Sequence, residues 1–180
     1  MRVIAGTAGG IRLGRVPRGT RPVSDRAREG LFSSLGERVR GARCADLFAG
    51  TGAMGIEALS RGAASCLFAD ASSGAVRAIR ENLERTGLGA RATVVRSDVD
   101  AALTRHRGPF DLALLDPPYA HAAEALQGLL ARLAGVMIQG STVALTRPKG
   151  NRTGVIPVHW SVVRTLTYGD TRILVLQEAA

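Results

Sequence analysis

Residues 46–55 read Asp-Leu-Phe-Ala-Gly-Thr-Gly-Ala-Met-Gly, an apolar run that leads into a glycine-rich turn and then a helix-forming segment. The glycines permit a tight turn and a close approach of a ligand to the backbone, and the free N–H groups of the following helix face that ligand. The Gly-x-Gly-x-x-Gly spacing is that of dinucleotide-binding turns, and Asp70, 20 residues past Gly50, suits ribose hydroxyls. A tight turn without a ligand is the alternative. The stretch predicts an adenosine-containing ligand in a Rossmann-like fold.

The segments that follow support an α/β fold. From Arg43 onward, short β-rich runs alternate with segments rich in Ala, Leu, Glu and Arg, which is typical of repeated βα units and a mostly parallel sheet. Two final β-rich runs flank Gly169-Asp170, a hairpin turn signal, so we predict a seven-stranded sheet that ends in an antiparallel pair. Strands are expected over 43–48, 65–69, 92–96, 110–115, 142–146, 155–168 and 171–177, and helices over 55–61, 73–86, 99–105 and 122–133.

The first forty residues are expected to form a separate element in two pieces. Residues 3–5 and 11–16, with glycines between them, predict a small β-hairpin. Two prolines then break the chain, and Ser24 is the expected N-cap of a helix over 25–35 that docks on the sheet. We therefore divide the chain into a basic β-hairpin arm at 1–22 and a main domain at 23–180, with the docking helix at about 24–36.

The charge of the chain is concentrated in this arm. The 180 residues carry 24 basic and 15 acidic side chains, a formal net charge of +9. Arginine forks match phosphate groups bidentately, so a basic arm predicts nucleic acid as the partner, although a solvated face has the same composition. The residues expected to contact nucleic acid are Arg2, Arg12, Arg15, Arg18, Arg21 and Arg26.

The remaining composition favours a cytoplasmic protein. Cys44 and Cys66 each lie in an apolar strand-like run without a partner at metal-ligand spacing, which predicts buried reduced thiols. No run approaches the roughly 18 apolar residues of a membrane span, and the first residues lack the apolar core of a signal peptide. We expect no membrane contact, no bound metal and a monomer.

Three carboxylates follow three successive strands, and parallel sheets bind ligands at the carboxyl ends of their strands. Asp46 would repel a pyrophosphate but suits the α-amino group of S-adenosylmethionine, Asp70 suits its ribose diol, and Asp98 can accept a hydrogen bond from its adenine amino group. Each carboxylate could instead cap a helix. The residues expected to bind this cofactor are Asp46, Phe48, Ala49, Gly50, Thr51, Gly52, Asp70, Ala71, Ser97, Asp98 and Val99.

Asp116-Pro117-Pro118-Tyr119 ends the buried run 110–115 and predicts the reaction. Neither proline nitrogen can donate a hydrogen bond, so the Asp116 carboxylate and the Pro117 carbonyl form a pair of acceptors. An exocyclic NH₂ group on a planar base is the complementary donor, and Tyr119 could stack on the ring. These four residues are the expected catalytic group, without a metal or a covalent nucleophile. Of the histidines, only His121 is a candidate RNA contact.

These motifs resemble those of S-adenosylmethionine-dependent amino-group methyltransferases. Residues 2–6, 21–29, 31–32 and 57–63 narrow the resemblance to the RsmD family of small-subunit ribosomal RNA guanine-N2 methyltransferases, over nearly the whole chain. The resemblance implies a class I methyltransferase fold and methylation of N2 of a guanine in 16S rRNA, within a small ribosomal subunit or an assembly intermediate. Asp70 stands where the family often has glutamate, and Thr146 stands where it commonly has a carboxylate, so the resemblance assigns Thr146 no role.

Three other functions use part of the same pattern. A DNA adenine-N6 methyltransferase would use the same tetrapeptide, but 180 residues leave little room for a target-recognition domain. A nicotinamide-dependent dehydrogenase shares the glycine turn without explaining residues 116–119. A non-catalytic RNA-binding ribosome assembly factor would not need the intact acceptor tetrapeptide.

Overall fold

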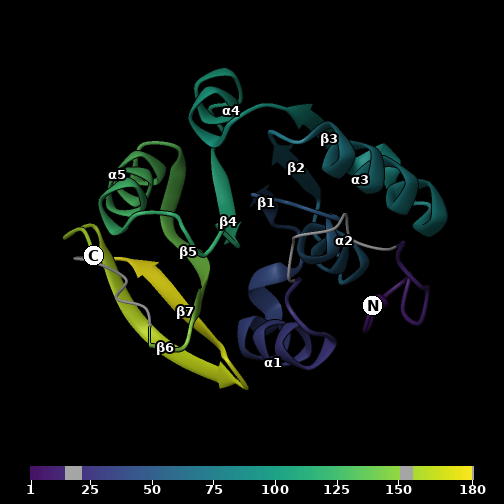
Figure 1. Cartoon of the computed structure of the whole chain (residues 1–180), viewed down its shortest axis with the longest axis horizontal. Helices are drawn as coiled ribbons and strands as arrows, with labels where there is room; N and C mark the ends of the chain where they lie inside the picture. Colours follow the sequence, from purple (N-terminus) through teal and green to yellow (C-terminus); the bar gives the residue numbers. More distant parts are fainter. Residues whose placement is uncertain (15–21, 151–155, 180) are drawn as a thin grey trace.

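The computed structural model describes residues 1–14, 22–150 and 156–179, and a single seven-stranded sheet organises them (Figure 1). The order of strands across the sheet is β3-β2-β1-β4-β5-β7-β6. Neighbours from β3 to β5 are parallel, whereas β7 lies antiparallel to both β5 and β6, so the predicted Rossmann-like sheet with an antiparallel C-terminal pair is confirmed. The strands are β1 (Arg43–Leu47), β2 (Ser65–Asp70), β3 (Ala92–Arg96), β4 (Phe110–Leu115), β5 (Met137–Pro148), β6 (Trp160–Tyr168) and β7 (Thr171–Glu178).

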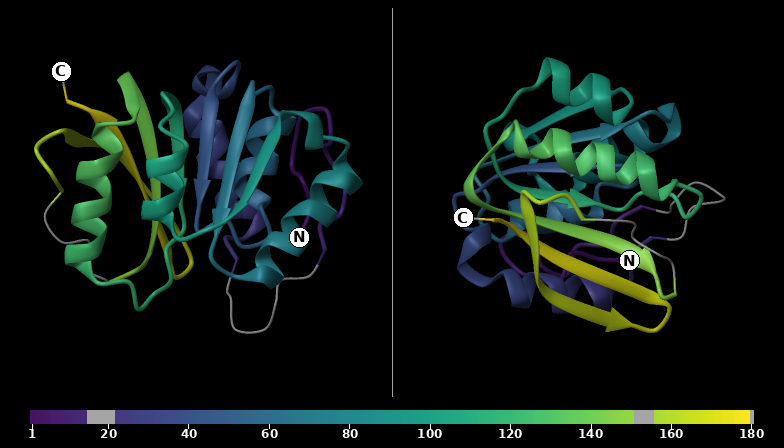
Figure 2. Two further views of the ribbon diagram at one scale, coloured as in Figure 1. Left: turned by 90° about the horizontal axis from the view of Figure 1, so that it is seen from above. Right: turned by 90° about the vertical axis from the view of Figure 1, so that its left-hand side faces the viewer.

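Helices cover both faces of the sheet (Figure 2). One apolar core joins the sheet to α1, α2 and α3, and a second core joins its other face to α4 and α5. No helix of the described ranges is long and apolar enough to cross a membrane. The helices are α1 (Asp25–Leu35), α2 (Ala53–Ser60), α3 (Ser73–Thr86), α4 (Val99–Arg105) and α5 (Ala123–Ala134), with short 3-10 turns at Gly36–Val39 and Gly89–Arg91.

The chain reverses its direction across the sheet between β1 and β4, and this reversal positions the site. In the parallel pairing of these strands, Leu47 lies opposite Leu115. Phe48 and Asp116, the next residues, therefore leave the sheet side by side at its carboxyl edge. An α/β sheet binds its ligand in the crevice at such a switch point.

The predicted boundaries differ from the observed ones by two residues or more at three elements, and by at most one residue elsewhere. Helix α2 begins at Ala53, two residues early, because Gly52 adopts a left-handed conformation (φ 78°) and forms the N-cap. Strand β5 begins at Met137, not at residue 142, because a register shift in its pairing with β4, with the extra residues in β5, lets Phe110 pair with Met137. Strand β6 begins at Trp160, and part of the segment predicted ahead of it lies outside the described residues.

The predicted N-terminal β-hairpin is wrong for the part of the arm that the structure describes. Its two halves are joined by a few backbone hydrogen bonds that amount to one antiparallel bridge, between Arg2 and Arg12, and no strand forms in residues 1–14. The reason lies in α2, whose Glu57 carboxylate accepts hydrogen bonds from the backbone amides of Ile4 (2.8 Å) and Ala5 (3.1 Å). The amide of Ala5 is therefore unavailable to extend the pairing of the two halves beyond Val3. Residues 15–21 of the predicted arm lie outside the described residues.

Two predictions about the rest of the chain are confirmed. Ser24 caps α1 by accepting a hydrogen bond from the backbone amide of Ala27 (3.2 Å), and the helix has the predicted bounds. Cys44 and Cys66 are buried on the adjacent strands β1 and β2 and form no disulfide. Burial raises the pKa of the Cys44 thiol to about 12, so it stays protonated at neutral pH.

Candidate active site

A cavity of about 650 Å³ opens at the carboxyl edge of the sheet, where the turns after β1, β2, β3 and β4 meet. The structure brings the sequence-predicted cofactor and acceptor residues to its wall, with one exception. Gly52 does not line the cavity, and an added Cβ there would contact Ile79 and Phe68 at 3.3 Å. The predicted residues on the wall are Asp46, Phe48, Ala49, Gly50, Thr51, Asp70, Ala71, Ser97, Asp98, Val99, Asp116, Pro117, Pro118 and Tyr119.

Asp46 places a buried carboxylate beneath the glycine turn. The residue is 1% exposed, and its Oδ2 accepts a hydrogen bond of 2.8 Å from the backbone amide of Gly55 in α2. Burial raises the pKa of Asp46 well above its usual value, against the opposing effect of this hydrogen bond. A Cβ on Gly55 would lie 2.4 Å from the Phe68 ring, so glycine lets the helix approach the sheet closely enough for the contact. A buried carboxylate of this kind is suited to a cationic ligand group.

Asp70 connects the ends of β1 and β2. Its Oδ2 accepts a hydrogen bond of 2.9 Å from the backbone amide of Gly50, and its Oδ1 accepts one of 2.8 Å from Ser72. Gly50 has a positive φ of 58°, a conformation that side chains other than glycine rarely adopt. Asp70 therefore fixes the glycine turn and borders the cavity with the same carboxylate.

Asp98 caps a helix and lines the cavity. Its Oδ1 accepts a hydrogen bond of 2.8 Å from the backbone amide of Ala101, in the first turn of α4. One of the two carboxylate oxygens of Asp98 therefore caps the helix, as the alternative interpretation predicts. Within the described chain its Oδ2 has no hydrogen bond and remains available as an acceptor.

Asp116 stands at the end of β4, which lies on the other side of β1 from the strand that carries Asp70. Its Oδ1 accepts a hydrogen bond from the hydroxyl of Thr146 on β5. Burial raises the pKa of Asp116 to about 6, and the bond from Thr146 opposes the rise. Beyond Asp116 in the chain, the carbonyl oxygen of Pro118 accepts a hydrogen bond of 2.9 Å from the backbone amide of His121. Tyr119, between these two residues, is 50% exposed. The tetrapeptide thus presents acceptors and an exposed ring.

Phe48 and His121 join the two loops on either side of the cavity. Their rings meet edge to face, with centroids 5.2 Å apart. Phe48 has a φ of 62°, in the left-handed region that a bulky residue occupies only at a cost in energy. His121 therefore packs against a cofactor-side residue, and the carbonyl oxygen of His121 accepts a hydrogen bond of 3.3 Å from Arg147.

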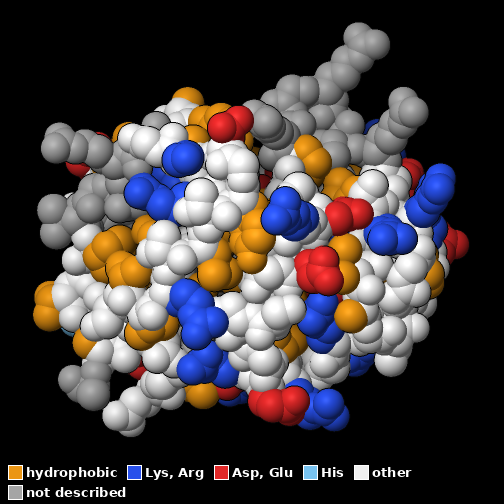
Figure 3. Space-filling view, turned by 90° about the horizontal axis from the view of Figure 1, so that it is seen from below, with side chains coloured by type: hydrophobic (Ala, Val, Ile, Leu, Met, Phe, Trp, Pro, Cys, Tyr) orange, Lys and Arg blue, Asp and Glu red, His pale blue; other side chains and the backbone are white. Residues whose placement is uncertain are grey.

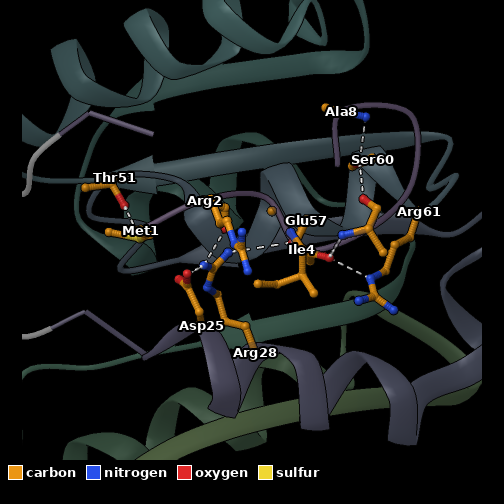
Figure 4. Close-up of polar contacts among 12 residues, drawn as sticks. Met1, Arg2, Ile4, Ala8, Asp25, Arg28, Thr51, Glu57, Ser60 and Arg61 are labelled. Atoms are coloured by element: carbon orange, nitrogen blue, oxygen red, sulfur yellow. Dashed lines mark hydrogen bonds and ion pairs between the residues drawn. The ribbon is translucent and has the colours of Figure 1, made fainter. Parts of the chain in front are cut away.

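Seven wall residues were not predicted from the sequence, and Arg28 is the most informative of them. It is fully buried on α1, and its Nη2 donates to Asp25 (2.5 Å) and to the carbonyl oxygen of Arg2 (2.7 Å) (Figure 4). Its Nε and Nη1 have no hydrogen bond to the residues that the structure describes, and Nη1 lies 3.6 Å from Glu57. The signal in the sequence is its helical spacing with the apolar residues 31, 32 and 35. The seven are Pro22, Val23, Arg28, Ala53, Met54, Ala69 and Ala120.

Of the arginines predicted to contact nucleic acid, those that the structure describes do not line the cavity. Arg2 and Arg12 form the bridge of the arm, and Arg26 is exposed on α1. Arg15, Arg18 and Arg21 lie outside the described residues. On the face shown in Figure 3, basic side chains alternate with acidic and apolar ones and do not gather in one patch.

Known proteins resemble this chain over two thirds or more of its length. A family model described as "Conserved hypothetical protein 95" matches residues 1–177. "Ribosomal RNA small subunit methyltransferase D" of Escherichia coli K12 is 30% identical over 182 residues, which cover 100% of this chain and 91% of the relative. "Putative rRNA methyltransferase YlbH" of Bacillus subtilis is 42% identical over 127 residues, 66% of this chain and 67% of the relative. The solved structure "Putative methyltransferase yhhF from Escherichia coli" superposes with a TM-score of 0.86 at 31% identity, covering 100% of this chain and 98% of the other.

Proposed function

The chain belongs to the family described as Conserved hypothetical protein 95, and from this membership and its cavity we propose that it methylates the exocyclic N2 amino group of a guanine in small-subunit ribosomal RNA. The methyl donor is S-adenosylmethionine. The observation that carries the proposal is the position of Asp116 and Pro117. They offer hydrogen-bond acceptors at the carboxyl edge of the sheet, on the same cavity wall as Asp46, Asp70 and Asp98.

The donor set of the cavity fits this cofactor. Asp46 is buried and has no cationic partner among residues 1–14, 22–150 and 156–179, so a positively charged α-amino group would compensate the charge of its ionised form. The neighbouring carboxylate of the cofactor suits Arg28, whose Nε has no hydrogen bond in the described part of the chain. Asp70 and Asp98 lie at the ends of the next two strands, where they suit the ribose diol and the adenine amino group. When bound, the cofactor supplies an electrophilic methyl group.

The residues at the end of β4 act on the amino group that receives the methyl. The lone pair of a guanine N2 is delocalised into the ring and is a poor nucleophile. Hydrogen bonds from its two N–H groups to Asp116 and to the Pro117 carbonyl favour pyramidal geometry and stabilise the positive charge that develops on nitrogen. Asp116 or a water molecule then takes the proton that N2 loses, and S-adenosylhomocysteine is left.

The proposal assigns the RNA to the surface around the same opening. Tyr119 is half exposed beside the acceptors and offers a ring on which the target base can stack. Residues 1–22 form the proposed RNA-contacting arm, with Arg2 and Arg12 as its described basic residues, and residues 23–180 form the methyltransferase domain. A base can be methylated only when it is unstacked or flipped, which favours a small subunit or an assembly intermediate as substrate.

The experiment that tests the proposal is methyl transfer from labelled S-adenosylmethionine to small ribosomal subunits that lack the modification. Duplex DNA is assayed in parallel, and the product nucleoside is identified by mass spectrometry. The proposal requires N2-methylguanosine from the subunits alone. N6-methyladenine in the DNA would show that DNA is the substrate in place of rRNA. An absence of label in every acceptor would favour a non-catalytic RNA-binding protein.

A further inference from the structure

Thr146 is buried beside the acceptor group, although the resemblance to a known family implies no role for it. It lies on β5, the parallel neighbour of β4, and the pairing of Leu115 with Leu145 places it next to Asp116. It is 3% exposed. Its hydroxyl donates to Asp116 Oδ1 and also lies 3.3 Å from the carbonyl oxygen of Leu115.

This contact gives the two oxygens of Asp116 different roles. A threonine hydroxyl has one proton to donate, and of its two neighbouring acceptors the ionised carboxylate forms the stronger bond. Asp116 Oδ1 is therefore engaged by Thr146. Oδ2 has no hydrogen bond within the described chain, and Asp116 lines the cavity.

We propose that Thr146 is a positioning residue for methyl transfer, whose hydroxyl holds the Asp116 carboxylate with Oδ2 directed at the amino group to be methylated. This inference rests on the proposed function. A carboxylate at the end of a strand can rotate about its side-chain bonds, and an acceptor that rotates does not point consistently at the attacking nitrogen. A donor fixed on the neighbouring strand removes that freedom, because β4 and β5 are held together by their ladder.

The same hydrogen bond favours the ionised form of Asp116, which is the form that accepts hydrogen bonds. Burial raises the pKa of Asp116 to about 6, and the bond from Thr146 acts in the opposite direction because it stabilises the ionised form. Without the hydroxyl, a larger fraction of Asp116 is protonated at neutral pH. The protonated carboxyl would present a donor where the amino group needs an acceptor.

Thr146→Val tests this role, because valine keeps nearly the same volume and removes the hydroxyl. We expect kcat for rRNA methylation to fall about tenfold, KM for S-adenosylmethionine to change less than about twofold, and the acidic limb of the pH profile to move up by about one pH unit. Thr146→Ser keeps the hydroxyl and should restore kcat and the pH profile. Thr146→Ala gives the same comparison should the valine variant not fold. Unchanged kcat and pH profile without the hydroxyl would overturn the proposal, and so would an equal loss in the serine variant.

A titration separates this proposal from the proposed function. The carboxyl carbon of Asp116, labelled with ¹³C and assigned by its loss in Asp116→Asn, reports its pKa by NMR without substrate. We expect a pKa near 6 in the wild type and a higher one in Thr146→Val. The proposed function fails alone if this shift is present while the wild type methylates no rRNA. An unshifted titration in an active enzyme overturns the role of Thr146 alone.

Discussion

The Asp70 carboxylate accepts a hydrogen bond of 2.9 Å from the backbone amide of Gly50, 20 residues earlier in the chain. The bond joins the end of β2 to the glycine turn after β1, so the residue proposed to bind the ribose also shapes the turn that approaches the cofactor. Removing the carboxylate therefore removes a ligand contact and loosens the loop beside it.

Asp70→Ala should weaken the binding of S-adenosylmethionine about 10- to 100-fold, since charge-assisted hydrogen bonds contribute about 1.5–3 kcal/mol. Isothermal titration calorimetry measures the change. Asp70→Glu is the matched control and should lose less, because it keeps a carboxylate that can reach the diol. Equal affinity in the alanine variant and the wild type would rule out the ribose contact.

Asp116→Ala should lower methyl transfer about 10²- to 10³-fold while the affinity for the cofactor changes little, because the carboxylate acts on the acceptor nitrogen. Single-turnover kinetics with labelled cofactor and cofactor binding by calorimetry separate the two effects. Asp116→Asn keeps one acceptor oxygen and should retain more activity than the alanine variant. Undiminished turnover in either variant would remove the catalytic role.

The raised pKa of Asp116 predicts how stability depends on pH. Its folded-state pKa of about 6 lies above the reference value of 3.8, so the folded protein binds this proton more tightly than the unfolded chain does. The contribution of Asp116 to the free energy of unfolding therefore declines as pH rises from about 4 to about 6. Asp116→Asn lacks this contribution, so it should gain stability relative to the wild type above pH 6. Urea unfolding at pH 4 and pH 7.5 measures the free energy of unfolding of both proteins. If the difference between variant and wild type is the same at both pH values, the prediction is wrong.

Glu57→Ala should lower the free energy of unfolding by about 3–5 kcal/mol, because Glu57 is fully buried between Arg28 and Arg61. The substitution also leaves the amides of Ile4 and Ala5 without their acceptor. Urea denaturation measures the loss, and hydrogen exchange at these two amides shows whether the arm is released. Glu57→Gln, which keeps acceptor oxygen, is the control and should lose less. A loss below about 1 kcal/mol in the alanine variant would contradict the role of Glu57.

Replacing Arg12, Arg15 and Arg18 together should weaken RNA binding and flatten its salt dependence by about 0.7–0.9 logarithmic units for each phosphate that the arm no longer neutralises. Filter binding over a range of salt concentrations provides the slope. Arg38 and Arg40, at the amino end of β1 and opposite the cavity, form the control pair, and their replacement should leave the slope unchanged. An unchanged slope in the arm variant would mean that these arginines do not bind phosphates.

The residues that the sequence could identify are those whose roles follow from local patterns. The turns after β1 and β4 were found because glycine and proline mark strand ends, and parallel strands bring those ends to one edge. Arg28 and Thr146 were missed because their roles depend on contacts that the local pattern does not contain. Arg28 interacts with Glu57, 29 residues away, and Thr146 acquires its contact only when β5 pairs with β4. The predicted hairpin failed for the same reason, since the Glu57 carboxylate on α2 takes the amide of Ala5.

Arg28 also connects the arm to the wall of the cavity. One guanidinium donates to the carbonyl oxygen of Arg2 in the arm and borders the cavity proposed for the cofactor. Were RNA to draw the first residues away from α1, the Nη2 donor that Arg2 now occupies would become available on the cavity wall. By thermodynamic linkage, cofactor binding then changes the affinity for that RNA by the same factor by which the RNA changes the affinity for the cofactor. The arm and the cavity would therefore act as reciprocal partners in substrate assembly.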